Sequence, residues 1–302
     1  MNRLIEDFDQ TQEQFWHLCT PGDLSGVLFA EKKDFEYGMN AVALTACKFY
    51  GKVTIYTFQL MSNHLHFLMS GELQDLQDFF KELKDKLQRY LSGIERSFEM
   101  QKFECRCFEI TNIIYLRNVL AYINRNGYLV DSAFTPFTYR WGANRYFFTP
   151  HSRQEPTVLL HKLSVREKRK LFRTHNFPFP DNFFIIDGYV SPLCYCHIEE
   201  AENWFEDAHH YFALVSRRVE AFADIARELG DSVIYTDEEI NWAALSLSKK
   251  QYDSSKPQLL SKEKKIEIAR QLKFGYNASN KQLKRILKLD ESIVEAMFPT
   301  KK

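Results

Sequence analysis

Long apolar runs are absent from this 302-residue sequence. A transmembrane helix needs about 18 or more consecutive apolar residues, and no segment offers them, so the sequence predicts no membrane partner. The opening residues, MNRLIEDFDQ, are too acidic and polar to predict a secretory signal peptide. We therefore expect a cytoplasmic protein.

Cysteine is scarce as well. Six cysteines in 302 residues are far too few for a disulfide scaffold, so reduced thiols are the simpler interpretation. Two pairs have the spacing C-x-C, Cys105 with Cys107 and Cys194 with Cys196, and His197 follows the second pair. Structural zinc sites use C-x₂₋₄-C, so this spacing argues against a separate zinc site.

The sequence has no excess charge of either sign, since 40 Lys and Arg balance 40 Asp and Glu. A polyanionic partner would therefore have to meet a local patch. One such patch runs from Lys256 to the end of the sequence, where there are twelve Lys and Arg but only five Asp and Glu. This asymmetry predicts a basic C-terminal module. No GxxxxGK[ST] loop is present, so no nucleotide cofactor is expected.

The first 150 residues alternate strand-like and helix-like patterns. Segments rich in β-branched and aromatic residues predict strands, and apolar residues recurring every three or four positions predict helices. The predicted strands are residues 15–20, 53–61, 64–70 and 106–110, and the predicted helices are residues 34–50, 73–91 and 113–126. This order favours an α+β fold in which helices cover an antiparallel sheet.

Three domains are expected along the chain. Residues 1–150 form the α+β domain just described. Residues 151–255 form a mostly helical domain of unknown role, with residues 198–229 largely helical and no motif that indicates chemistry. Residues 256–302 form a basic module of short helices.

Two histidines stand out in the stretch FQLMSNHLHFLMS. His64 and His66 are two residues apart on a predicted strand, so their side chains project to the same face. Neutral imidazole nitrogens bind divalent metals readily, and a pair of them can hold one ion. The alternative is two surface histidines whose ring nitrogens are satisfied by hydrogen bonds.

The segment Met61-Ser62-Asn63-His64-Leu65-His66 resembles the His-hydrophobic-His (HUH) signature of single-tyrosine DNA transposases, which commonly reads Met-Pro-Asn-His-hydrophobic-His. Relaxases and rolling-circle replication proteins share the histidine pair. The resemblance implies that His64 and His66 bind the catalytic metal ion. Ser62 stands at the usual proline position and removes no ligand.

A second segment, AYINRNGYLV, resembles the Tyr-Ile-x-x-Asn-Pro stretch of the REP-associated branch of that family. The resemblance places Tyr122 at the nucleophile position and Asn126 at the asparagine position. The two are four residues apart, hence on one face of a helix, where Asn126 could help to hold the metal through its amide oxygen. Gly127 replaces the proline, and both residue types end helices. The alternatives are that Tyr122 only packs in the core, or that Tyr115 is the nucleophile.

The resemblance covers about residues 10–148 and implies a ferredoxin-like HUH endonuclease fold with a Mg²⁺ or Mn²⁺ cofactor. A tyrosine hydroxyl has a pKa near 10, so attack on a phosphodiester needs a cation that polarises the phosphate. The implied product is a covalent phosphotyrosine at a 5′ DNA end. The implied partner is single-stranded or hairpin DNA in a bacterial cytoplasm, near the nucleoid, and the family tends to act as a homodimer.

The C-terminal module begins with a predicted helix over residues 259–272, for which Ser261 is the expected N-cap. Two shorter helices follow with a turn near Leu289 and Asp290, as in a helix-turn-helix. The first of these has a basic face, formed by Lys281, Lys284, Arg285 and Lys288. The second helix has no Lys or Arg, although a second helix normally reads bases. DNA contact through the first helix, or no DNA contact, both stay open.

Further DNA contacts are expected from the catalytic domain. Lys81 and Lys84 lie on the polar side of the predicted helix 73–91, a stripe that also fits a solvated face. Arg125 lies between the expected nucleophile and the expected metal-binding asparagine.

Taken together, the residues favour a metal-dependent DNA nickase and strand transferase of the transposase type. A catalytically silent DNA-binding regulator would keep the fold without the chemistry. A metal-dependent phosphoesterase would use water as its nucleophile and form no covalent intermediate.

Overall fold

The structure is a computed structural model, and it describes residues 8, 13–20, 27–96, 100, 103–129, 138–153, 157–216, 237–276 and 278–299. These residues form two compact units. The first unit holds the described residues up to 128 and from 138 to 216, and the second holds residue 129 and those from 237 onward. This division differs from the expected boundaries at residues 150 and 255, because the segment after the first boundary packs on the helices of the first sheet.

The first unit is built around a four-stranded sheet of β1 (Phe15–Cys19), β2 (Val53–Leu60), β3 (Leu65–Gly71) and β4 (Arg106–Ile110). The spatial order is β2-β3-β1-β4, and neighbouring strands are antiparallel throughout. The predicted α+β architecture with an antiparallel sheet is therefore confirmed. The strands coincide closely with the predicted segments, and β2, which is the richest in β-branched and aromatic residues, is the longest of them.

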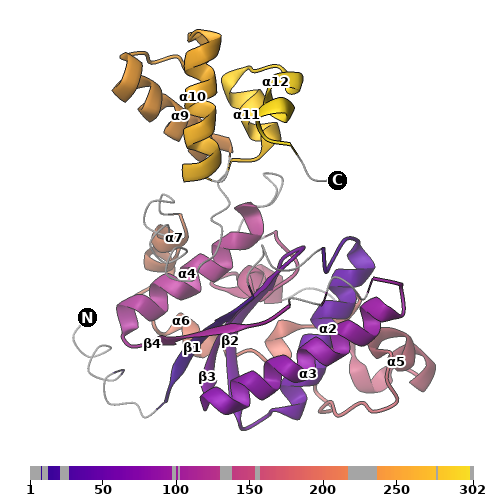
Figure 1. Ribbon diagram of the computed structural model, residues 1–302. Coiled ribbons are helices and arrows are strands. Elements are labelled where there is room, and N and C mark those ends of the chain that lie inside the picture. The colour runs from indigo at the N-terminus through magenta and orange to yellow at the C-terminus, as the bar shows by residue number, and fades with distance from the viewer. Residues whose placement is uncertain are drawn as a thin grey trace. The chain divides into compact units, whose positions relative to one another are not determined.

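Helices cover both faces of this sheet (Figure 1). α2 (Lys32–Lys48) and α3 (Leu73–Ser92) lie on the face that carries Phe67, whose ring contacts Phe79 of α3 at a centroid distance of 5.8 Å. α4 (Ile113–Leu129) lies on the opposite face, which carries Gln59 and His66. Because side chains alternate along each strand, the two histidines of the motif lie on the α4 side.

The long apolar stripe predicted over residues 73–91 is buried as expected. Its buried members, each at most 6 % exposed, are Leu76, Phe79, Phe80, Leu83, Leu87 and Leu91. Gly142 covers part of the outer edge of β2, where it forms a bridge with Gln59. A Cβ atom there would lie 2.4 Å from the carbonyl oxygen of Phe58, so this close approach requires glycine.

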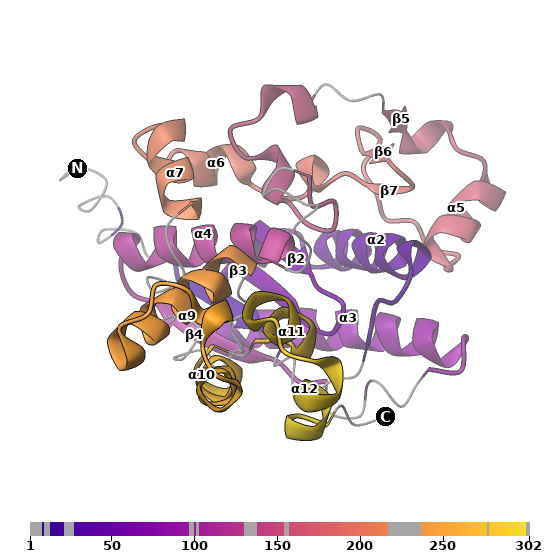
Figure 2. The ribbon, with the colours of Figure 1, turned by 90° about the horizontal axis from the view of Figure 1, so that it is seen from above.

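The segment from 157 to 216 is mixed rather than mostly helical. It forms a small sheet, β5 (Val158–Leu159), β6 (Phe184–Ile186) and β7 (Tyr189–Val190), together with α5 (Val165–Phe172), α6 (Ile198–Glu202) and α7 (Ala208–Val215). The small sheet and α5 pack beside α2, and α6 and α7 lie beside α4 (Figure 2). Of the helical stretch predicted over 198–229, residues after 216 lie outside the described part.

Short 3₁₀ helices connect these elements. They are η2 (Asn144–Tyr146), η3 (Pro150–Arg153), η4 (Leu160–Lys162), η5 (Pro192–Cys194) and, in the second unit, η6 (Pro257–Leu259). None of the helices that the structure describes has the length and apolar character needed for a membrane span.

The second unit consists of α9 (Asp237–Tyr252), α10 (Lys262–Gly275), α11 (Asn280–Leu287) and α12 (Glu291–Met297). Ser261 is the N-cap residue of α10, as predicted, and Ser279 caps α11 with a reciprocal bond to Gln282. Its core is apolar, with the buried members Ile240, Ala243, Ala244, Ile268, Ala269, Leu272, Ala278, Leu283, Ile286, Leu287, Leu289 and Val294. α11 ends at Lys288 in the left-handed conformation, which gives the turn before α12.

Candidate metal and tyrosine site

Two neighbouring strands bring three ligating side chains together beneath α4. Cys19 of β1 lies opposite His66 of β3 in the strand register, and His17 is two residues before Cys19 on the same face. One ligand atom from each of these residues lies within 4.8 Å of the others, and all three side chains are buried. The Nε2 atom of His17 is 3.1 Å from the Nδ1 atom of His66. This group could bind a metal ion.

His64 lies just before β3, beside His66 as predicted. The centroids of the two rings are 4.9 Å apart and the rings are perpendicular. His64 is 6 % exposed and His66 is fully buried, so they are not a pair of surface histidines. The Nδ1 atom of His64 is 2.7 Å from Oδ1 of Asn63, and this contact orients the ring.

Tyr122 of α4 lies over this group of rings. Its ring centroid is 5.6 Å from that of His66 and 6.2 Å from that of His17, and the side chain is 4 % exposed. The structure thus brings together the tyrosine and the histidine pair, which are more than 50 residues apart in the sequence. Tyr115 is half-buried and lies about two turns earlier on the same helix.

Asn126 is placed one turn after Tyr122 on α4 and is half-buried. Within the described part of the chain it makes no hydrogen bond to His64 or His66. The predicted set of His64, His66 and Asn126 therefore has its two imidazoles adjacent, with the amide on the neighbouring helix.

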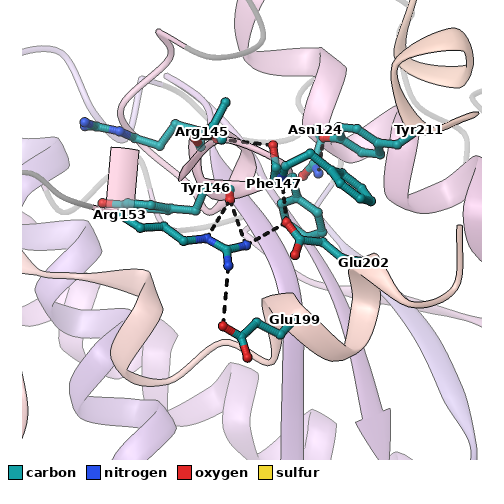
Figure 3. A network of polar contacts seen from close by, with 10 residues as sticks. Asn124, Arg145, Tyr146, Phe147, Arg153, Glu199, Glu202 and Tyr211 are labelled. Carbon is teal, nitrogen blue, oxygen red and sulfur yellow. Dashed lines mark hydrogen bonds and ion pairs between the residues drawn. The ribbon is translucent and has the colours of Figure 1, made fainter. Parts of the chain in front are cut away.

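Asn124 fixes α4 against the sheet and against α7. Thr57 of β2 donates its hydroxyl to Oδ1 of Asn124 at 2.5 Å, and Nε2 of Gln59 donates to the Asn124 carbonyl at 3.1 Å. The amide of Asn124 donates to the hydroxyl of Tyr211 at 2.9 Å (Figure 3). Because these groups are buried, the bonds hold Tyr122, two residues away, above the histidines.

Arg153 connects the segment after α4 to α6. Its guanidinium donates to the carbonyl of Tyr146 and forms ion pairs with Glu199 and Glu202 (Figure 3). Glu202 also accepts a hydrogen bond from the backbone N–H of Phe148. These contacts join η2 and η3 to α6, which lies beside α4.

Gln59 adds a buried amide group to the sheet face that carries the histidines. It is fully buried and lies opposite His66 in the register of β2 and β3. Its amide nitrogen bonds to Asn124, whereas its Oε1 atom has no hydrogen-bond partner among the described residues. A buried amide oxygen without a partner costs about 1–3 kcal/mol. An oxygen donor of this kind suits a metal ion or a proton donor.

The residues expected to contact DNA lie in several places. Lys81 is exposed and Lys84 half-buried on α3, on the face of the sheet opposite the histidines. Arg125 is only 3 % exposed, because α4 is covered by the sheet on one side and by later segments on the other. The side chain of Arg125 is therefore not at the surface, where a DNA contact was expected.

In the second unit, Lys281, Lys284, Arg285 and Lys288 are all exposed. Arg285 and Lys288 line a groove of about 580 Å³ together with Lys256, Asn241 and Gln258. Among the residues whose side chains the structure describes, no carboxylate lines this groove. Lys284 instead pairs with Glu291 of α12.

His17, Cys19 and Gln59 were not predicted from the sequence. Side chains alternate along a strand, so the segment FWHLCT does predict that His17 and Cys19 share one face. It does not predict which strand lies beside them. No group of three ligating side chains forms around Cys105 and Cys107, or around Cys194 and Cys196, in the part of the chain that the structure describes.

Chemically, the site combines imidazole, thiol and amide donors with a buried phenol. No protein-family model, curated protein or solved structure matches this chain.

Proposed function

We propose that the protein nicks and rejoins single-stranded or hairpin DNA through a covalent bond to Tyr122, as HUH single-tyrosine transposases do. The observation that carries this proposal is the position of the Tyr122 ring, which lies against His66 and His17 on the same sheet face. The strand order β2-β3-β1-β4, with α2 and α3 as crossovers, supports a ferredoxin-like HUH fold.

The residues present fit a divalent cation. His64 and His66 offer adjacent imidazoles, and the amide oxygens of Gln59 or Asn126 would complete a mixed nitrogen and oxygen set suited to Mn²⁺ or Mg²⁺. When bound, the cation supplies electrostatic stabilisation of the phosphate that is attacked. His17 orients the ring of His66 through the contact between Nε2 and Nδ1.

Tyr122 would form the new bond. Its phenol oxygen attacks the scissile phosphorus and its proton leaves to solvent, while the bond from phosphorus to the 3′ oxygen breaks and that oxygen takes a proton from solvent to become a free 3′-hydroxyl. Burial of the ring keeps the phenol in a fixed position, so little orientational freedom is lost on reaching the transition state. The reverse attack by a 3′-hydroxyl would restore the phosphodiester and release the tyrosine.

The second unit would bind the DNA backbone. The described lining of the groove includes the cations of Lys256, Arg285 and Lys288 and no carboxylate, which favours phosphate contacts. α11 and α12 have the order of a helix-turn-helix. The basic groups belong to α11 and the segment before α10, so backbone contact through the first helix is proposed rather than base reading by the second.

The decisive experiment incubates the full-length protein with end-labelled hairpin DNA and Mn²⁺, then separates the products on a denaturing gel. Wild type and Tyr115→Phe should both give an SDS-resistant protein–DNA band, and Tyr122→Phe should give none. Cleavage without that band would favour a phosphoesterase that uses water. DNA binding without cleavage, in wild type as in Tyr122→Phe, would favour a silent regulator.

A further inference from the structure

The group His17, Cys19 and His66 has a donor set that differs from the one needed for nicking. Two imidazoles and a thiol converge from β1 and β3, and the group contains no carboxylate. Mg²⁺ prefers oxygen ligands, whereas Zn²⁺ and Co²⁺ readily take nitrogen and thiolate sulfur. The chemistry of the group therefore selects a softer metal than the nicking reaction would use.

The distance between the two ring nitrogens fits joint coordination of one ion. Zinc–nitrogen bonds of about 2.0–2.1 Å at a tetrahedral angle place two ligand nitrogens roughly 3.3–3.4 Å apart. The observed separation of 3.1 Å between Nε2 of His17 and Nδ1 of His66 is within a few tenths of an ångström of that value. An ion can thus replace the contact between these nitrogens with little movement of either strand.

Cys19 lies close enough to complete three protein ligands. Its sulfur is within 4.8 Å of one ring nitrogen of each histidine. Zinc–sulfur bonds of about 2.3 Å would require it to approach to roughly 3.6 Å, a shift that side-chain rotation can supply. The fourth position would fall to water or to the oxygen of Gln59, which lies opposite His66 and has no hydrogen-bond partner in the described part of the chain.

We propose that His17, Cys19 and His66 form a binding site for a zinc-type ion and that its occupation switches the nicking site off. On binding, the Cys19 thiol releases its proton to solvent, and His66 binds through Nδ1. A neutral imidazole has one proton and one free lone pair, so its remaining proton then resides on Nε2. His66 can no longer offer Nε2 to the nicking cation.

The metal site stands on geometry alone, whereas the inhibition rests on the proposed function. The two parts can therefore fail separately. Binding is measured without DNA, and inhibition is measured with the adduct assay.

Binding is tested by titrating Co²⁺ into the full-length reduced protein and recording its absorption spectrum. Wild type should develop a thiolate-to-cobalt charge-transfer band in the near ultraviolet at one equivalent, and Zn²⁺ but not excess Mg²⁺ should abolish it. Cys19→Ser should lack the band, and the control Cys107→Ser, on β4, should retain it. Absence of the band in folded wild type, or its persistence in Cys19→Ser, would overturn the proposal.

X-ray absorption spectroscopy of zinc-loaded wild type keeps the test independent of variant folding. The zinc shell should contain one sulfur and two imidazole nitrogens, and a shell without sulfur would contradict the site. In the adduct assay, one equivalent of Zn²⁺ should reduce the Mn²⁺-supported product at least tenfold in wild type but not in Cys19→Ser. Equal inhibition of both proteins would refute the switch. If neither forms an adduct, the proposed function fails and the cobalt result stands alone.

Discussion

The Nε2 atom of His17 lies 3.1 Å from the Nδ1 atom of His66, although the two residues are 49 positions apart in the sequence. This contact joins β1 to β3 at the point where the ring of Tyr122 lies against both imidazoles. The orientation of His66, and hence its ability to bind a cation, depends on a residue outside the histidine motif.

His17→Ala should weaken binding of Mn²⁺, because the ring of His66 loses the partner that fixes its orientation. Loss of such an outer partner lowers metal affinity by about 10–100-fold. Isothermal titration calorimetry measures the change. The control is His197→Ala, at an exposed position beside the edge of β2 that faces away from β3. Equal Mn²⁺ affinity in His17→Ala and wild type would show that His17 does not orient the ligand.

Asn124→Ala should lower the free energy of unfolding by about 1–3 kcal/mol, because Thr57 and Tyr211 lose a buried hydrogen-bond partner. Urea unfolding measures this change. The same variant should form adduct more slowly at unchanged DNA affinity, since Tyr122 loses its positioning. Asn118→Ala, at a half-buried position on the same helix, should leave both quantities unchanged. Normal adduct kinetics in folded Asn124→Ala would remove Asn124 from the account of the site.

The sequence predicted the local part of this site. A strand period of two places His64 and His66 together, and a helix period of 3.6 places Tyr122 and Asn126 one turn apart, so both relationships follow from neighbouring residues. His17 and Cys19 depend on β1 lying next to β3, which is a property of strand order. The position of the Gln59 Oε1 atom could not be predicted from the sequence either, because it depends on the amide nitrogen of Gln59 bonding to Asn124.

Two other differences between the predictions and the structure also arise from tertiary packing. Arg125 is polar and close to the expected nucleophile, which suggested a DNA contact, but burial of α4 on two sides encloses it. The segment from 157 to 216 has no repeated pattern, since its strands are two or three residues long and are stabilised by packing on α2.

The groove of the second unit should contribute a salt-dependent part of DNA affinity. Lys256→Ala and Lys288→Ala should each weaken binding for all sequences and reduce the slope of log affinity against log salt by about 1, because each removes one phosphate contact. Fluorescence anisotropy of full-length protein at several salt concentrations gives the slope. Lys284→Ala, which removes a cation already paired with Glu291, should have less effect. Unchanged slopes in the first two variants would place the DNA elsewhere.

The thiols should differ in reactivity. The Cys105 thiol donates a hydrogen bond to the sulfur of Cys107 and so lowers the pKa of Cys107, whereas burial raises the pKa of Cys47 and of Cys194 to about 11. Brief treatment with iodoacetamide at pH 7.5, followed by peptide mass spectrometry, should modify Cys107 before Cys47 and Cys194. Cys105→Ala should slow that modification. Preferential alkylation of Cys47 would contradict this order.

Acid should remove one contribution to the packing of α2 on α3. Burial opposes ionisation of Glu82, but hydrogen bonds from Lys48 and Lys86 outweigh it and lower the pKa of Glu82 from 4.5 to about 2. A carboxyl group with a depressed folded-state pKa stabilises the fold above pH 4.5 and loses that effect as the pH falls toward about 2. Glu82→Gln should therefore be less stable than wild type at pH 7, with the difference shrinking below pH 4.5. A pH-independent difference, or an equal effect of Asp85→Asn, would rule out this ion pair as the cause.

The proposed function requires the phenol of Tyr122 to become bonded to DNA. It is tested most directly by digesting the Mn²⁺-dependent reaction with nuclease and protease and sequencing the modified peptide by mass spectrometry. We expect a nucleotide phosphate attached to Tyr122. Attachment at Tyr115 or at another residue, or cleaved DNA with no modified peptide, would contradict it.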